Sequence, residues 1–112
     1  QSRDFTFVGS VVDVLADCVM RTVSCAHPVN LAFGTRTSLN DLIALLSALL
    51  GRELEVVHGP ARNGDVRHSQ ASGSALRKLF PSVQPVSLEA ALSRTAEWVE
   101  RLVNSEVSRS TA

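Results

Sequence analysis

Residues 59–69, GPARNGDVRHS, concentrate side chains that could bind an anion. Arg62, Arg67 and His68 stand here against a single acid, Asp65, with glycines and a proline between them. An arginine guanidinium matches a phosphate or carboxylate group bidentately, and loops on a rigid scaffold commonly carry binding groups. Charged loops are also common as solvated turns. By itself the stretch favours a solvated turn, and an anion site needs support from elsewhere in the chain.

Other kinds of chemistry have weaker support. The nearest set of metal-ligand residue types is His58, Asp65 and His68, but they share no helical or zinc-finger spacing, so we predict no zinc site. No serine has the nucleophile-elbow context that would favour a Ser-His-acid triad. Basic residues are not interleaved with aromatic ones, which argues against stacking on single-stranded nucleic acid. We therefore predict neither a metal centre nor a hydrolytic site.

The elements that must position the loop are a mixture of strands and helices. Alternating or apolar runs predict three short strands, at 3–8, 29–33 and 53–59. Apolar residues at helical spacing predict four helices, over 8–23, 38–50, 74–80 and 88–103. The arginine loop would then connect the third strand to the third helix. The predicted fold class is α/β (α+β).

The helix over 38–50 has the clearest boundaries. Ser38 is a suitable N-cap, and Asp41 at the third helical position makes a variant of the capping box. Gly51 stands where a left-handed C-terminal cap belongs. Ser87 is placed to cap the last helix.

Length and composition indicate one globular domain without a strong electrostatic field. We expect the 112 residues to form a single domain over 1–104, followed by a flexible polar tail at 105–112. Hydrophobic residues make up 45%, which excludes disorder by composition. The 11 basic and 11 acidic residues cancel, so no net charge attracts nucleic acid or an anionic membrane. No apolar run approaches the roughly 18 residues of a membrane span.

The two cysteines point to a reducing compartment. Cys18 and Cys25 lie in one helical pattern, about 10 Å apart along an axis that rises about 1.5 Å per residue. A disulfide needs Cα atoms within about 7 Å, so both should be free thiols. The polar start, QSRDF, lacks a signal-peptide pattern and is either a processed end or a cut in a longer chain. We expect a cytoplasmic protein.

Four segments occur in a specific order. They are RDFTFV followed by a helix, VNLAFGTRTSLNDLIALLSALLGRELEV, GPARNGDVRHSQAS, and VSLEAALSRTAEWVERL. This series resembles the carboxy-terminal, substrate-binding part of NAD-dependent sugar-nucleotide epimerases and dehydratases. These enzymes are extended short-chain dehydrogenases, and UDP-glucose 4-epimerase is a well-known representative. The resemblance covers residues 3–103, and its weight comes from the four segments together.

The resemblance assigns roles to the arginine loop. In such enzymes the arginine of the RDF segment and the arginine two residues before the Gly-Asp pair hold the nucleotide diphosphate. The aspartate of that pair holds the ribose. The matching positions here are Arg3, Arg62 and Asp65. Arg36, in the GTRT segment, is a weaker candidate for the same site. Two guanidinium groups suit a pyrophosphate, and a carboxylate accepts hydrogen bonds from ribose hydroxyls.

The departures from the family pattern concern catalysis. The cofactor-binding Rossmann half and its glycine-rich turn are missing. The catalytic Tyr-x-x-x-Lys cannot exist, because the chain has no tyrosine and its only lysine is Lys78. We expect no cofactor, and no catalysis from this chain alone. Gly9-Ser10 and Ser72-Gly73 also replace acidic helix starts of the family, and Ser10 and Ser72 could serve as N-caps instead.

Two functions of different class follow. The chain is either an epimerase-like substrate-binding domain with weak affinity for a nucleotide sugar, acting alone or with a separate Rossmann-type partner, or a free-standing structural or interaction module with a vestigial site. In both cases we expect a homodimer or higher oligomer. The reason is that the apolar run 29–33 and the first helix pack against the cofactor half in the family and would otherwise be exposed.

Overall fold

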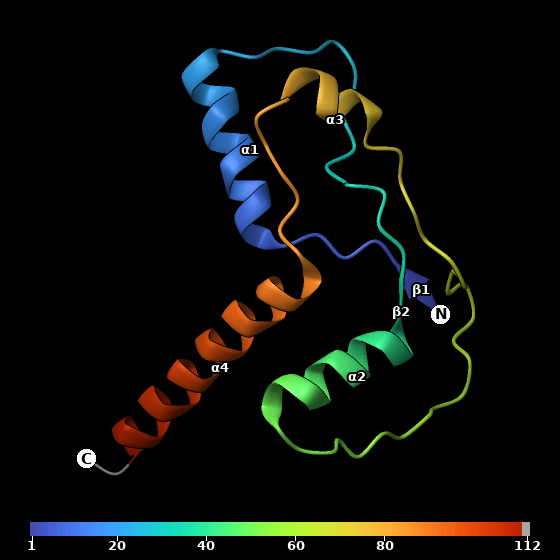
Figure 1. Cartoon of the computed structure of the whole chain (residues 1–112), viewed down its shortest axis with the longest axis vertical. Helices are drawn as coiled ribbons and strands as arrows, with labels where there is room; N and C mark the ends of the chain where they lie inside the picture. The colour runs from blue at the N-terminus through green and yellow to red at the C-terminus, as the bar shows by residue number, and fades with distance from the viewer. Residues whose placement is uncertain (111–112) are drawn as a thin grey trace.

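The computed structural model describes residues 1–110 and combines helices with a small sheet (Figure 1). The elements are β1 (Ser2–Arg3), α1 (Val8–Arg21), β2 (Thr37–Ser38), α2 (Leu39–Leu50), α3 (Ser74–Leu79) and α4 (Leu88–Ser110). β1 and β2 pair antiparallel, with Ser2 opposite Ser38 and Arg3 opposite Thr37. The mixed fold class and the four helices are confirmed.

The prediction of three strands is wrong. Of the strand expected at 3–8, only Arg3 is in a strand, and neither 29–33 nor 53–59 forms one. The run 29–33 instead packs its apolar side chains against the core between α1 and α3, so its hydrophobicity reflects burial against helices. Residues 53–59 are mostly exposed and find no neighbouring strand within residues 1–110. β2 was not predicted, because two polar residues carry no alternating pattern.

α1 and α4 end at positions other than those predicted, whereas α2 ends at Leu50 as predicted. α1 ends at Arg21, because Thr22 adopts a left-handed conformation with φ 53°. α4 continues past its predicted end to Ser110, so 105–110 of the expected flexible tail are helical and the predicted domain boundary falls within α4. Residues 111–112 of that tail lie outside the described residues.

Three of the predicted caps are present. Ser38 Oγ accepts from the Asp41 N–H at 3.1 Å, and the Asp41 carboxylate accepts from the Ser38 N–H at 3.3 Å, which completes a capping box. Gly51 ends α2 with φ 62°. Ser87 Oγ accepts from the Ala90 N–H at 3.2 Å and so caps α4.

The two alternative caps differ from expectation. The N-cap of α1 is Phe7, which has no side-chain cap, and Ser10 is buried inside the first turn with no hydrogen-bond partner for its Oγ in the described structure. Ser10 is too far into the helix to act as a cap. The N-cap of α3 is Gly73, although Ser72 Oγ accepts a long, 3.5 Å hydrogen bond from the Ser74 N–H.

The core lies between α1 and α3, and α2 packs on the first part of α4 (Figure 1). Val14, Leu76 and Phe80 are its fully buried members. Arg21 links α1 to α3, because its guanidinium donates to the Leu79 carbonyl at 2.8 Å. Within α1 the same guanidinium pairs with Asp17 at 2.6 Å.

The outer face of α1 has no covering element in the described structure. Its exposed apolar side chains are Val8, Val12, Leu15, Val19 and Met20. Cys18 and Cys25 are both free thiols, as predicted. Across residues 1–110, no helix combines the length and apolar character that crossing a bilayer would need.

Candidate functional site

β1 joins three distant segments of the chain. Besides pairing with β2, Ser2 bonds through its backbone to the arginine loop: its N–H donates to the Arg67 carbonyl at 3.0 Å, and its carbonyl accepts from the Ser69 N–H at 3.1 Å. The Gln1 carbonyl accepts from the Leu39 N–H, at the start of α2, at 3.0 Å. The end of the arginine loop is therefore fixed beside β1 and the start of α2.

The structure brings Arg3 and Asp65 into contact. Arg3 Nη2 lies 2.7 Å from Asp65 Oδ1, and Gln1 Nε2 donates to Asp65 Oδ2 at 2.7 Å. Arg3 also donates to the Ser2 carbonyl at 2.9 Å. Both members of the ion pair remain about one-third exposed, at 28% and 32%. A residue expected at the diphosphate and one expected at the ribose thus neutralise one another in the free chain.

A tight turn places Arg62 next to Asp65. The Asp65 N–H donates to the Arg62 carbonyl at 3.2 Å, and Gly64 has φ 84°. A positive φ at the third turn position is typical of a type II turn and favours glycine. The Arg62 side chain is exposed and has no ion pair or hydrogen bond within the described structure. Its guanidinium is available to a ligand.

Arg62 and Asp65 line an open hollow beside the start of α2. Its volume is about 450 Å³. The other lining residues are Gln1, Leu39, Asn40, Ile43, Val56, Val57, His58, Gly59, Pro60 and Ala61. The hollow therefore has apolar walls from α2 and residues 56–61, and charged groups at the turn. Mostly apolar walls with a few polar groups are typical of small-molecule sites.

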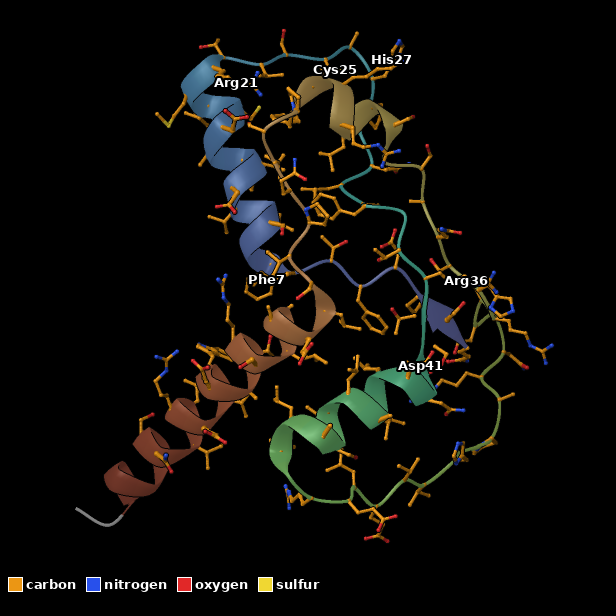
Figure 2. The ribbon with its side chains drawn as sticks, viewed as in Figure 1. Phe7, Arg21, Cys25, His27, Arg36 and Asp41 are labelled. Carbon is orange, nitrogen blue, oxygen red and sulfur yellow. The ribbon has the colours of Figure 1, made fainter. Side chains whose placement is uncertain are left out.

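Arg36 lies on the same side of the molecule, next to β1 (Figure 2). Its Nε donates to Ser2 Oγ at 3.1 Å. Asp4 holds the two residues that precede Arg36. Its carboxylate accepts from the Gly34 N–H at 3.0 Å and from Thr35 Oγ1 at 2.6 Å. We call the place where β1 meets β2, the start of α2 and the end of the arginine loop the junction. Arg3 and Arg36 bond to Ser2 there, Asp65 bonds to Arg3 and Gln1, and Arg62 precedes Asp65 in the loop. Their role in ligand binding stays a prediction.

The contact between Ser2 and His68 was not predicted from the sequence. Ser2 is buried, with 5% of its surface exposed, and its Oγ lies 2.8 Å from His68 Nδ1. Burial lowers the pKa of His68, and the positive charges of Arg36, the amino terminus, Arg67 and Arg3 lower it further. No local pattern marks Ser2, because its contacts come from segments more than 30 residues away along the chain. From the sequence, His68 was considered as a cation of the arginine loop and as a metal-ligand type, without a connection to Ser2.

The structure places the candidate metal ligands in different surroundings. Within the described residues, no group of three or more histidine, cysteine, aspartate or glutamate side chains is placed to hold a metal ion. His58 lines the hollow beside α2, whereas His68 bonds to Ser2.

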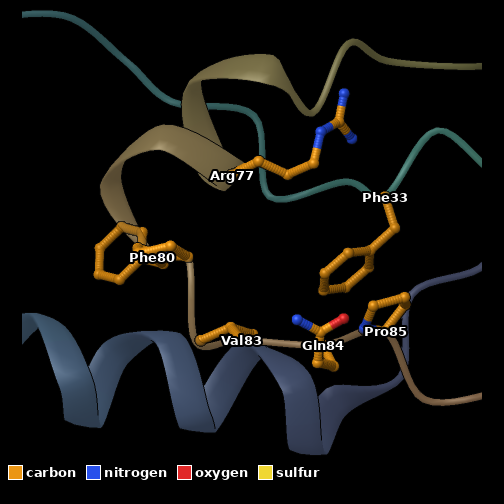
Figure 3. Close-up of a pocket in the computed structure, with 7 residues that line it drawn as sticks. Phe33, Arg77, Phe80, Val83, Gln84 and Pro85 are labelled. Atoms are coloured by element: carbon orange, nitrogen blue, oxygen red, sulfur yellow. The ribbon is translucent and has the colours of Figure 1, made fainter.

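A second hollow lies away from the arginine loop, between α3 and the segments on either side (Figure 3). Its volume is about 360 Å³. Phe33 points into it, and Arg77 reaches its edge from α3. The rest of the wall consists of Phe80, Pro81, Val83, Gln84 and Pro85. None of the residues predicted for the anion site lines it, so it is separate from that site.

Comparison with known proteins identifies the fold around the junction. No family model matches the sequence. The structure of MoeE5 in complex with UDP-glucuronic acid and NAD superposes with a TM-score of 0.78 and 28% sequence identity, over 90% of this chain and 34% of that one. The chain resembles part of an extended short-chain dehydrogenase. This confirms the resemblance drawn from the four sequence segments.

Two curated relatives of this chain are sugar-nucleotide epimerases. The UDP-glucuronate 4-epimerase of Thermodesulfobacterium geofontis is 28% identical over 104 residues, which are 88% of this chain and 30% of the relative. The dTDP-L-rhamnose 4-epimerase of Burkholderia thailandensis is 26% identical over 98 residues, 88% of this chain and 27% of the relative. The chain spans about a third of the length of the proteins it matches.

Proposed function

We propose that this chain is an epimerase-like substrate-binding domain that binds the diphosphate of a nucleotide sugar weakly. The observation that carries the proposal is that Arg62, exposed and without a partner in the described structure, lines the same hollow next to α2 as Asp65, which pairs with Arg3. Two arginines supply bidentate donors for a pyrophosphate, and Asp65 supplies an acceptor for ribose hydroxyls. Arg36 adds a third positive charge at the junction.

The ligand class follows from the relatives. The names of the relatives and of the structural neighbour refer to UDP-glucuronate, dTDP-L-rhamnose and UDP-glucuronic acid, which share a pyrimidine nucleoside diphosphate. We propose the same chemistry for this chain, without a choice of sugar. The binding is expected to be weak, because the hollow is open and Arg62 is exposed to solvent. Salt screens the charge of an exposed arginine effectively.

We further propose that these 112 residues do not catalyse an NAD-dependent reaction by themselves. They contain neither a tyrosine to act as the family's base nor a glycine-rich turn for the dinucleotide. The role that remains for the site is to bind and orient a substrate, through Arg3, Arg36, Arg62 and Asp65. We also propose a cytoplasmic location, which suits the two free thiols.

Calorimetry with UDP-glucuronic acid at low and at physiological salt tests the proposal. Free glucuronic acid, which lacks the diphosphate, is the control ligand. We expect binding of the nucleotide sugar only, with an affinity that falls as salt rises. Equal binding of both ligands, or no binding of either at millimolar concentration, would contradict it.

The exposed face of α1 favours a second function, that of an oligomeric interaction module. Val19 and Met20 are 79% and 85% exposed, and they continue the apolar stripe of Val8, Val12 and Leu15. Exposed apolar patches of this kind mark interaction surfaces. A second copy of the chain or a separate Rossmann-type partner would cover the stripe. Sedimentation of the pure chain separates these cases, because only self-association raises its mass.

A further inference from the structure

Ser2 Oγ connects His68 to one of the candidate arginines. Arginine side chains only donate hydrogen bonds, so the 3.1 Å contact from Arg36 Nε uses one lone pair of Ser2 Oγ. The hydroxyl keeps its proton and its second lone pair, and His68 Nδ1 lies 2.8 Å away. Ser2 Oγ can therefore donate to a neutral His68 or accept from a protonated one, so the contact suits both charge states of the ring.

The surroundings of His68, in contrast, oppose a charged ring. Arg36 faces it from the segment before β2, Arg3 from β1, and Arg67 from its own loop, and the amino terminus adds a further positive charge. The acid of the loop, Asp65, is paired with Arg3. His68 thus lies among cations with no carboxylate of its own, and its pKa is lowered by burial first and by these charges second.

A bound diphosphate would reverse this balance. Its negative charges would lie at Arg3 and Arg36, which both donate to Ser2 beside His68, and would offset the repulsion between these cations and a protonated ring. We propose that His68 is the proton-linked residue of the nucleotide-sugar site and that it takes up a proton when a diphosphate occupies Arg3 and Arg36. The inference rests on the proposed function and adds to it a residue and a pH dependence.

Thermodynamic linkage fixes the direction of the effect. If the bound state holds one more proton than the free state, affinity rises as the pH falls between the free and the bound pKa of His68. For a single proton the rise is about tenfold for each pH unit in that window. His68 also has a structural role, because its contact with Ser2 joins the arginine loop to β1. Proton uptake on binding distinguishes the two roles, since a purely structural residue would give none.

The test is an NMR titration of the histidine rings in the wild-type chain, free and saturated with UDP-glucuronic acid or with inorganic pyrophosphate. We expect either anion to raise the pKa of His68 while His27, an exposed residue of a remote loop, is unchanged. Calorimetry in two buffers of different ionisation enthalpy should show net proton uptake on binding at about pH 6.5, the usual pKa of histidine.

The matched variants are His68→Asn and His27→Asn. An asparagine oxygen can still accept from Ser2 but cannot titrate there, so His68→Asn should keep binding and lose proton uptake. His27→Asn should change neither. Binding of both anions with an unchanged His68 pKa would overturn this inference and leave the proposed function standing. Binding of pyrophosphate alone with a raised pKa would keep the inference and contradict the nucleotide-sugar assignment, and no binding at all would overturn both.

Discussion

Arg3 Nη2 lies 2.7 Å from Asp65 Oδ1, so the free chain holds its diphosphate-binding candidate and its ribose-binding candidate as one ion pair. Gln1 secures the second carboxylate oxygen, Oδ2, at 2.7 Å. A ligand that uses both residues must share or exchange these bonds. The pair is partly exposed, and such pairs contribute only about 0.2–1 kcal/mol, so its opening by a ligand costs little.

The first prediction concerns Asp65→Asn. Removal of the carboxylate frees Arg3 and removes a repulsive charge, so inorganic pyrophosphate should bind about fivefold more tightly, equivalent to about 1 kcal/mol. UDP-glucuronic acid should gain less or bind more weakly, because an asparagine is a poorer acceptor for ribose hydroxyls than a carboxylate. Calorimetry with both ligands checks the contrast. Equal gains for the two would mean that Asp65 does not contact the ribose.

The second prediction concerns Arg62→Ala. The side chain is exposed and has no partner in the described structure, so the variant should keep the wild-type melting temperature. It should lose at least tenfold in affinity for UDP-glucuronic acid, because it lacks one bidentate donor. Arg52→Ala, another exposed arginine just past the end of α2, is the matched control and should bind normally. Unchanged binding by Arg62→Ala would show that the family role does not apply at this position.

The sequence predicted the helices better than the strands, for a physical reason. Helix signals are local: the capping box of Ser38 and Asp41, and the glycine at position 51, lie next to the residues they cap. A strand depends on a partner elsewhere in the chain. The apolar run 29–33 finds α1 and α3 as its neighbours, whereas the polar residues Thr37–Ser38 find β1.

The site follows the same rule. Arg3, Arg62 and Asp65 could be named from the sequence because the resemblance marks their positions, and the structure brings Arg3 and Asp65 together. Ser2 and His68 could not be paired from the sequence, because 66 positions separate them and the bond depends on how the arginine loop returns to β1. The resemblance assigned Arg3 and Asp65 to separate ligand contacts, and only the structure shows that they pair with each other.

The third prediction concerns acid stability. Because the fold lowers the pKa of His68 below its usual value near 6.5, the unfolded chain binds more protons than the folded chain in that range. The stabilisation from neutral His68 is therefore complete above about pH 6.5 and is lost as the pH falls through the lowered folded pKa. Urea unfolding at pH 7 and pH 5 should show a stability loss that His68→Asn reduces and His27→Asn does not. An equal loss in all three proteins would assign the acid effect to other groups.

The fourth prediction concerns the capping box of α2, which starts next to the hollow. Ser38→Ala removes the acceptor for the Asp41 N–H and should lower the free energy of unfolding by about 0.5–2 kcal/mol. The loss should also weaken binding of UDP-glucuronic acid, because Leu39, the first residue of α2, bonds to the Gln1 carbonyl. Ser38→Asp, which retains an N-cap acceptor, should restore most of both. A destabilised variant with normal affinity would separate the helix start from the site.

The last prediction concerns the apolar face of α1. Val12 and Leu15 are 57% and 58% exposed in the isolated chain, and burial of such side chains stabilises an assembly by about 1.5–3 kcal/mol each when complete. Association costs roughly 4–15 kcal/mol, so several such side chains must be buried to offset it. The full stripe from Val8 to Met20 provides several. We therefore expect a dimer at tens of micromolar by sedimentation equilibrium, and a monomer for the double variant Val12→Glu, Leu15→Glu. Ala44→Glu, at an exposed position of α2, should leave the dimer intact. A wild-type monomer would contradict self-association through this face. A dimer that survives the double variant would place the self-association surface elsewhere, and the exposed face of α4 that includes Trp98 is the next one to test.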